Sequence, residues 1–346
     1  MNALLSPRRR SLMIGAAGAI ALAGCGRPAG RAELHFTGET MGTTYNVKVA
    51  HWSQPGRLSE LHESVQAAFD GVNRSMSLHR TDSELARFNR SAGDVVLSED
   101  FWRVVAAGQE VASVTDGAFD MTVAPLVVRW GFGPAPRGRM PQHEEIRAIR
   151  DRTGHQALHL DGARRLAVKR RADLELDLGG IAKGYGVDLA ARSLDAAGAE
   201  HYMVEAGGEV FTRGVNGEGQ PWRIGIEQPD ALPPRARMVV PLTGQAMATS
   251  GDYRNYFEAD GRRYSHEIDP RTGEPVDHRL CSVTVVAGDC MRADALATAL
   301  LVLGPDRGLR LAESLGLAAH FIERLAPGRY ADRQSRALAA LGSRAA

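Results

Sequence analysis

The segment from residue 177 to residue 184 combines an acid, glycines and a lysine in an order that suits phosphate binding. Its sequence is Asp-Leu-Gly-Gly-Ile-Ala-Lys-Gly, and it joins a predicted strand to a predicted helix. Glycines let a ligand approach the backbone closely, and the N–H groups at a helix N-terminus bind a pyrophosphate well. Lys183 would add a positive charge; the structural alternative is a tight turn with Lys183 in solvent. The segment matches neither the GxGxxG nor the GxxxxGK[ST] pattern, so the sequence predicts neither a Rossmann nor a Walker site.

A carboxylate and a hydroxyl stand four residues apart further along the chain, at Asp294 and Thr298. Residues at this spacing share one face of a helix. Two such oxygens could hold Mg²⁺, which prefers oxygen ligands and keeps several waters. Alternatively, Asp294 caps the helix and Thr298 bonds back to a backbone carbonyl. Taken alone, this segment favours the structural alternative.

A histidine and a serine are candidates for acid–base or nucleophilic chemistry. His266 precedes a strong turn at 269–273 and could act as a general base, although a single histidine more often has a structural role. Ser250 could be a nucleophile in principle. However, the chain has no G-x-S-x-G elbow and no evident order of Asp and His partners, so the sequence does not predict a serine hydrolase.

The elements that must position these residues show both strand and helix periodicity. Helices are predicted at 58–72, 83–89, 101–115, 142–150, 181–197, 292–303 and 312–317. Strands are predicted at 44–49, 174–178, 201–205, 222–227, 238–242, 245–249, 264–268, 280–286 and 318–322. Since strands and helices mix without strict βαβ alternation, we expect an α+β fold of mixed sheets with packed helices.

The composition is ordinary for a globular protein. The 346 residues are 44% hydrophobic and 24% charged, and the net charge is +1. Basic and acidic residues are interleaved and form no basic stripe, so we expect no nucleic-acid partner. Cys281 and Cys290 could form a disulfide or remain two free buried thiols, and their spacing does not decide between these alternatives.

The N-terminus resembles a bacterial lipoprotein signal. Three arginines at 8–10 precede an apolar run at 12–23, which is short for a membrane span, and small residues then precede Cys25. The paired arginines also resemble a twin-arginine export signal. We therefore expect a signal peptide at 1–24 and a lipidated Cys25 with a tether at 25–36. This predicts an exported, membrane-anchored lipoprotein facing the periplasm; the alternative is an uncleaved anchor with an incidental cysteine.

Several segments, taken in order, resemble one enzyme family, the FAD:protein FMN transferase (ApbE) family, from about Thr37 to Ile322. Besides 177–184, they are Met-Gly-Thr-Thr at 41–44, Phe-Asp-Met-Thr-Val-Ala-Pro-Leu at 119–126, Trp-Gly-Phe-Gly at 130–133, Gly-Gly at 207–208, Thr-Ser-Gly-Asp-Tyr-Arg at 249–254, His-Glu-Ile-Asp-Pro-Arg-Thr-Gly at 266–273 and Ala-Asp-Ala-Leu-Ala-Thr at 293–298. The resemblance implies a T-fold-related architecture. We expect the catalytic domain at 37–325 and a flexible tail at 326–346, which is polar and rich in alanine.

The resemblance implies a Mg²⁺-dependent enzyme that binds FAD as its substrate. Such enzymes transfer FMN to a Thr or Ser hydroxyl of a target flavoprotein and release AMP, and their acceptors include flavoprotein subunits of membrane redox complexes. His266 is the implied base, and the implied metal ligands are Asp294, Thr298 and the carbonyl of Gly180. The implied FAD contacts are Met41, His79, Phe119, Asp120, Met121, Asp177, Lys183 and Ile268.

Two positions differ from the pattern of many family members. His79 stands where many have tyrosine, and Ala297 stands where some have a second acid. If water replaced the acceptor, the same site would hydrolyse FAD to FMN and AMP, so an FAD pyrophosphatase is the alternative function. A flavin-binding lipoprotein without turnover is a further alternative.

Overall fold

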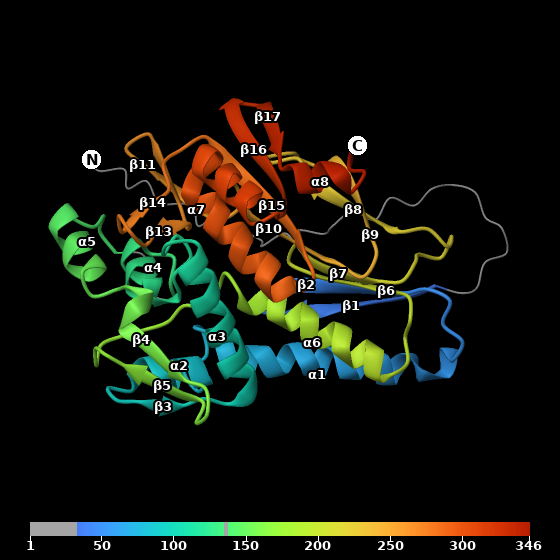
Figure 1. The fold of residues 1–346 in the computed structure, drawn as a ribbon, viewed down its shortest axis with the longest axis horizontal. Helices are drawn as coiled ribbons and strands as arrows, with labels where there is room; N and C mark the ends of the chain where they lie inside the picture. Colours follow the sequence, from blue (N-terminus) through green and yellow to red (C-terminus); the bar gives the residue numbers. More distant parts are fainter. Residues whose placement is uncertain (1–32, 135–137) are drawn as a thin grey trace, which may run out of the picture.

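The computed structural model describes residues 33–134 and 138–346, and its largest element is an eight-stranded sheet (Figure 1). The strand order is β1-β2-β6-β7-β10-β15-β16-β17, and every neighbouring pair is antiparallel. Side chains alternate across it as the sequence predicts: β2 buries Tyr45, Val47 and Val49 on one face. The strands are β1 Leu34–Thr40, β2 Thr43–Val49, β6 Tyr202–Ala206, β7 Glu209–Arg213, β10 Ala246–Gly251, β15 Leu280–Ala287, β16 Ala318–Ala326 and β17 Arg329–Gln334.

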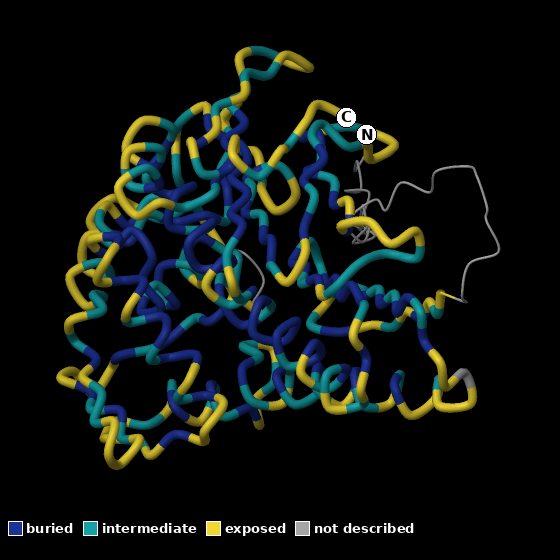
Figure 2. Tube along the Cα trace, turned by 45° about the vertical axis from the view of Figure 1, so that its right-hand side comes forward, coloured by how far each residue is buried: buried dark blue, intermediate teal, exposed yellow. Residues whose placement is uncertain are grey.

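Three helices cover one face of this sheet: α1 (Leu58–Met76), α6 (Ala182–Ala196) and α7 (Cys290–Ser314). α6 packs between α1 and α7, so residues far apart in sequence meet there. Buried residues concentrate where these helices meet the sheet, whereas most exposed residues lie in the outer loops (Figure 2). The backbone of α7 breaks at Gly304, whose φ is 77°, just before Pro305. The sequence predicts the end of a helix at this point.

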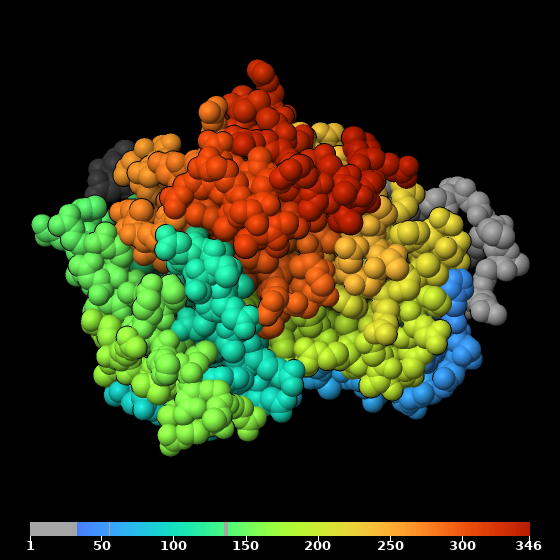
Figure 3. Space-filling view, viewed as in Figure 1, coloured from blue at the N-terminus to red at the C-terminus, as the bar shows by residue number. Residues whose placement is uncertain are grey.

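The opposite face of the sheet carries a smaller layer. It consists of β8 (Trp222–Glu227), β9 (Ala236–Leu242), β18 (Arg344–Ala345) and the short helix α8 (Arg336–Ala340). The expectation of a flexible tail at 326–346 is therefore wrong. β17 pairs with β16, and Leu338 of α8 is fully buried in the core on this face. The red C-terminal atoms in Figure 3 accordingly lie against the rest of the molecule. The segment is polar on average, but α8 has an apolar side that packs on the core, and the composition alone does not show this side.

A helical lobe lies at one end of the molecule. Serines cap two of its helices, with Ser83 Oγ accepting from Ala86 N and Ser98 Oγ accepting from Phe101 N. The lobe contains α2 Glu84–Arg90, α3 Glu99–Val114, α4 Ala124–Trp130, α5 His143–Arg150, β3 Val95–Val96, β4 Leu158–Asp161 and β5 Leu166–Lys169. Two hairpins complete the fold: β11 Tyr256–Ala259 with β12 Arg262–Ser265, and β13 Ile268–Asp269 with β14 Glu274–Pro275.

The strand predicted at 174–178 is wrong, because this segment pairs with no strand among the described residues. Its backbone bonds elsewhere. Asn89 Nδ2 donates to the Leu176 carbonyl at 2.9 Å, and the Leu176 N–H donates to Asn89 Oδ1 at 2.8 Å. The Asp177 N–H donates to the Met121 carbonyl at 2.7 Å. A side-chain amide thus replaces a neighbouring strand.

The α+β prediction is confirmed, and most predicted elements are confirmed to within four residues at each end. The sequence did not predict β1, β3, β4, β5, β7, β11, β14, β17, β18, α4 or α8. β1 begins at Leu34, so the last residues of the predicted tether belong to the sheet.

The cysteines and the N-terminus have different outcomes. Cys281 and Cys290 are both buried and free, so the free-thiol alternative is confirmed and the disulfide is wrong. Cys25 and the predicted signal peptide lie outside the described residues. Within 33–134 and 138–346, no helix is both long and apolar enough to cross a membrane.

Candidate functional site

A cavity of about 890 Å³ lies where the sheet, α6, α7 and the helical lobe meet. This volume suits a large organic ligand. Loops at 76–80, 118–120, 177–180, 207–209 and 249–255 contribute to its wall. The predicted site residues that line it are Met41, His79, Phe119, Asp120, Asp177, Gly180, Lys183, His266, Ile268, Asp294 and Thr298.

The glycine-rich turn brings the start of α6 to this cavity. Gly180 has no side chain, and a Cβ there would lie 3.0 Å from Thr298 Oγ1 and 3.4 Å from Phe119. The turn therefore fits close against α7 and the ring of Phe119. Asp177 Oδ1 accepts from the Gly179 N–H at 2.7 Å, and burial raises the pKa of Asp177. The acid thus shapes the loop that precedes the helix.

Helices α6 and α7 are joined by carboxylates that accept backbone N–H bonds. Asp188 on α6 accepts from the N–H groups of Cys290 at 2.8 Å and Met291 at 2.9 Å, so it caps the start of α7. In return, Asp294 on α7 accepts from the Gly184 N–H at 3.0 Å. Asp294 does not cap its own helix; the N-cap of α7 is Asp289, which accepts from Arg292 N. The alternative that Asp294 caps its own helix is therefore wrong, because its carboxylate bonds to the start of α6 instead.

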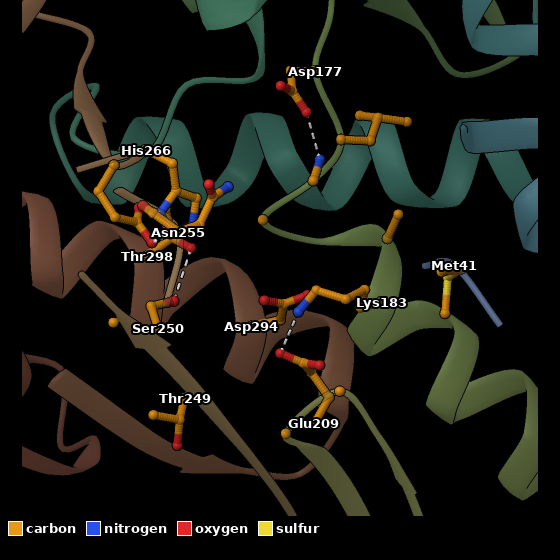
Figure 4. A pocket seen from close by; sticks show the side chains of 18 of the residues that line it. Met41, Asp177, Lys183, Glu209, Thr249, Ser250, Asn255, His266, Asp294 and Thr298 are labelled. Atoms are coloured by element: carbon orange, nitrogen blue, oxygen red, sulfur yellow. Dashed lines mark hydrogen bonds and ion pairs between the residues drawn. The ribbon is translucent and has the colours of Figure 1, made fainter. Parts of the chain in front are cut away.

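Three charged side chains gather at the floor of the cavity, as Figure 4 shows. Lys183 Nζ lies 2.5 Å from Glu209 Oε1, and Asp294 is close enough to affect both groups. Glu209 is only 1% exposed, whereas the Lys183 side chain is 33% exposed. Burial raises the pKa of Glu209 and of Asp294, and the positive charge of Lys183 opposes both shifts. Burial would lower the pKa of Lys183, but the two carboxylates outweigh it and raise that pKa.

The predicted metal ligands lie together and supply only oxygen. The Thr298 hydroxyl is 3.0 Å from the Ser250 hydroxyl and faces the Gly180 turn, while Asp294 stands one helical turn away on the same face of α7. Carboxylate, hydroxyl and carbonyl oxygens are the donors that Mg²⁺ prefers, so these residues fit that ion. Within the described part of the chain, no three His, Cys, Asp or Glu side chains cluster as a metal-binding group. A cation at these ligands would therefore have one carboxylate, that of Asp294, beside the Thr298 hydroxyl and the Gly180 carbonyl.

His266 stands at the wall of the same cavity with one ring nitrogen fixed. His266 Nδ1 lies 3.0 Å from the Asn255 carbonyl oxygen, which can only accept, so Nδ1 carries a proton. In the neutral ring, Nε2 is then the nitrogen that can take up a proton; it lies 3.5 Å from Glu267 Oε1. The side chain is 34% exposed, and the edge of the Phe132 ring supports it. The geometry suits a general base reached from solvent.

Two of the predicted FAD contacts have structural roles instead of an open position in the cavity. Both oxygens of Asp120 are occupied by bonds from Thr122 and from the His155 N–H, although Asp120 does line the cavity. Met121 does not line it: its side chain packs into the core beside Gly108, and its carbonyl accepts from Asp177. The Met121 side chain thus faces the core, and the contact of Met121 with FAD stays a prediction. The Met121 backbone holds the Asp177 loop in place.

Reasoning from the sequence missed one residue of the charged cluster, Glu209. Glu209 follows the Gly207-Gly208 turn, whose φ values of 64° and 106° only glycine adopts readily. The two glycines were the sequence feature that could have indicated this residue, because the turn that they form places Glu209 next to Lys183. The Ser250 hydroxyl bonds to that of Thr298, in agreement with the expectation that the chain is no serine hydrolase.

Comparisons with known proteins agree with this geometry. The family model described as "ApbE family" matches residues 41–321. The FAD:protein FMN transferase of Vibrio cholerae is 44% identical over 310 residues, which are 88% of this chain and 91% of that protein. That of Haemophilus influenzae is 42% identical and covers 90% and 92% of the two chains.

Solved structures show the same similarity. The Pseudomonas stutzeri flavinyl transferase ApbE, in its apo form, superposes with a TM-score of 0.82 at 43% identity, over 90% of this chain and 97% of that chain. The ApbE protein of Thermotoga maritima superposes with a TM-score of 0.80 at 30% identity, over 90% and 99%.

Proposed function

Because the chain belongs to the ApbE family, we infer that it is an FAD:protein FMN transferase, an enzyme that moves the FMN half of FAD onto a target protein. One observation carries the chemical detail that we propose. A single cavity holds a cationic Lys183, the oxygen donors Asp294 and Thr298, and His266 with Nε2 able to take up a proton. A phosphate-binding group, a cation site and a base are what phosphoryl transfer requires.

In this proposal, the pyrophosphate of FAD lies against the Gly180 turn and Lys183. The oxygen of a Thr or Ser hydroxyl on the acceptor attacks the phosphorus of the FMN half. The P–O bond to AMP breaks, so AMP leaves with its own phosphate. His266 Nε2 takes the proton of the attacking hydroxyl, and the Asn255 carbonyl keeps the ring oriented by holding the proton on Nδ1.

The proposed cofactor is Mg²⁺, held by Asp294, Thr298 and the Gly180 carbonyl. When bound, it would neutralise negative charge on the phosphate oxygens. Two hydrogen bonds hold the side chains of these ligands in place: the Gly184 N–H donates to the carboxylate of Asp294, and the Ser250 hydroxyl bonds to that of Thr298. Fixed ligands reduce the cost of organising the site when substrate arrives.

The experiment is to incubate the purified chain with FAD, Mg²⁺ and a candidate acceptor domain that carries a Thr or Ser. AMP is measured by chromatography, and flavin on the acceptor is measured by in-gel fluorescence. We expect both products, with loss of both when the metal is chelated or when Asp294→Asn replaces the carboxylate. An acceptor with valine in place of the modified residue is the matched control. AMP without labelled acceptor would support an FAD pyrophosphatase, and bound FAD without AMP would support a flavin-binding protein.

We also propose that the acceptors are flavoprotein subunits of membrane redox complexes and that the enzyme is anchored beside them. The support is the segment before Cys25, which resembles a bacterial lipoprotein signal and ends in small residues next to this cysteine. Cys25→Ser should prevent incorporation of a radiolabelled fatty acid and move the protein from the membrane to the soluble fraction, with AMP release unchanged. If Cys25→Ser stayed on the membrane, the N-terminal apolar run would itself be the anchor.

A further inference from the structure

A second cavity, of about 380 Å³, lies beside the proposed FAD cavity and shares part of its wall. Arg235 lines both cavities, and the chain passes from one to the other between Glu227 and Gln228. Arg263 and Arg324 also line the second cavity, which we call the arginine pocket. A ligand bound in the arginine pocket would therefore lie next to the substrate in the larger cavity.

Arg324 holds the wall of the arginine pocket together. Its guanidinium donates to Asp230, in the connection between β8 and β9, at 3.1 and 3.2 Å, and to both carboxylate oxygens of Asp252 at 3.1 Å. The Tyr330 hydroxyl also donates to Asp230, at 2.7 Å. Because these bonds join separate segments of the chain, the pocket keeps its shape through the protein's own contacts.

The other two arginines of the pocket have no carboxylate partner among the described residues. Arg235 is exposed, and its side chain makes no hydrogen bond or ion pair there. Arg263 donates from Nη2 to the Asp252 carbonyl at 3.1 Å, and its guanidinium lies 3.5 Å from the centroid of the Tyr256 ring. Glu258 stands opposite Arg263 in the β11–β12 hairpin but forms no ion pair with it. Both arginines thus keep donors for an anion, and the guanidinium group suits a carboxylate.

The β11–β12 hairpin connects the arginine pocket to the proposed base. It carries Arg263, and it lies between Asn255 and His266, whose N–H donates to the Asn255 carbonyl at 3.1 Å. Beside the arginines, Tyr256 is 42% exposed, and Leu232, in the connection between β8 and β9, is 93% exposed. Arginine and aromatic side chains are enriched at protein–protein interfaces. A protein whose hydroxyl reaches His266 would therefore have neighbouring residues near this surface.

We propose that the arginine pocket binds an acidic side chain of the acceptor protein, close in sequence to the Thr or Ser that receives FMN. This rests on the proposed function and deepens it, since it names a feature that the enzyme recognises in its acceptor. The carboxylate would pair with Arg235 and Arg263 while FAD fills the neighbouring cavity. A protein carboxylate is favoured over a lipid phosphate, because Arg235 also borders the cavity in which the acceptor must react.

The probes are two peptides that differ only in charge and carry a red fluorophore. Each has a single Thr among glycines and alanines, flanked on both sides by Asp in one peptide and by Lys in the other. Binding to the full chain is measured by fluorescence anisotropy, with FAD and a chelator present. We expect the Asp peptide to bind roughly tenfold more tightly, which lies within what a charge pair about 4 Å apart gives between bulk water and a protein surface. Added salt should reduce this preference.

The variants remove the two unpaired arginines. Arg235→Gln/Arg263→Gln should abolish the preference for the Asp peptide, and Arg235→Gln alone should reduce it by about threefold, with FAD affinity unchanged in both. The matched control is Arg223→Gln, because Arg223 is an exposed arginine of β8 that lines neither cavity. If circular dichroism shows that the double variant does not fold, Arg235→Gln still decides, since its side chain is exposed.

Equal affinity of the wild type for the two peptides would overturn the proposal, and so would an unchanged preference in the variants. Loss of FAD affinity in the variants would make the arginines FAD contacts and would also overturn it. Binding to phosphatidylglycerol vesicles that needs both arginines, without a preference between the peptides, would assign the pocket to a membrane instead. Failure of the proposed function is separate: a wild type that releases no AMP from FAD would refute the transferase, whereas equal peptide affinities beside normal AMP release would refute only the recognition of an acidic side chain.

Discussion

Replacing Gly184 with alanine tests whether the contact between α6 and α7 holds the site together. A Cβ at this position would lie 2.3 Å from the carbonyl oxygen of Cys290 and 2.9 Å from the Cβ of Asp294. Non-bonded heavy atoms do not approach so closely, so the two helices must separate by about 1 Å. The bond from the Gly184 N–H to Asp294, now 3.0 Å long, would be weakened or lost.

The magnitude follows from three opposing effects. Alanine gains about 1 kcal/mol over glycine inside a helix. Overpacking costs about 1–3 kcal/mol, and the weakened bond to a buried carboxylate costs about 1.5–3 kcal/mol. We therefore expect the free energy of unfolding to fall by about 1.5–5 kcal/mol and Tm to fall by about 5 °C or more. Because Asp294 also moves, AMP release should fall by about 100-fold.

Thermal unfolding by circular dichroism and AMP release from FAD measure the two effects. Gly71→Ala is the control, because Gly71 lies inside α1 and a Cβ there would meet nothing within 4 Å. That variant should gain about 0.5–1 kcal/mol and keep full activity. If Gly184→Ala were as stable and active as Gly71→Ala, the close contact between α6 and α7 would be refuted.

Three further predictions concern other parts of the molecule. Leu338→Ala should lower the free energy of unfolding, measured in urea, by about 2–5 kcal/mol, because the side chain is fully buried. An unchanged free energy of unfolding would instead support a flexible C-terminal tail. Burial raises the pKa of Asp188 to about 6, so the folded state binds its proton more tightly than the unfolded state does. Stability should therefore fall by up to about 3 kcal/mol as pH rises from about 4 to about 6, and urea titrations at several pH values should show no such fall in Asp188→Asn. His266→Ala should slow FMN transfer by about 10²–10⁴-fold with FAD affinity unchanged, whereas lost FAD binding would make His266 a cofactor contact.

Local periodicity predicted much of the fold because many elements bury one face. β8 at Trp222–Glu227 was predicted to the residue, since its apolar side chains alternate. The same pattern misled at 174–178. Leu174, Leu176 and Leu178 alternate like a buried strand and are indeed buried, but the partner of this backbone is the side chain of Asn89. Burial was readable from the sequence, whereas the hydrogen-bond partner was not.

The candidate site was predicted where residues close in sequence supply the chemistry. Asp294 and Thr298 share a helix, and Gly180 and Lys183 lie three residues apart at the start of α6. Their spacing alone favoured structural roles, so their place in the candidate site was predicted from the family resemblance. The partnership of Lys183 with Glu209 joins two elements and depends on the turn at Gly207 and Gly208. The direction of the Met121 side chain could not be predicted from neighbouring residues in the sequence. It faces the core because α3 packs against it, and α3 is a separate element.

The capping of α7 by α6 has a consequence for how the protein is made. Asp188 and Cys290 are 102 residues apart in the chain, and Gly184 and Asp294 are 110 apart. At the usual pace of about 5–20 residues per second, the ribosome reaches the partners of α6 roughly 5–20 s after α6 itself. During that interval, the Gly180 turn and the start of α6 exist without α7, the helix that they contact. The pocket is thus completed only when nearly the whole chain has been synthesised, and a truncated product that stops before α7 is a chain without an active site.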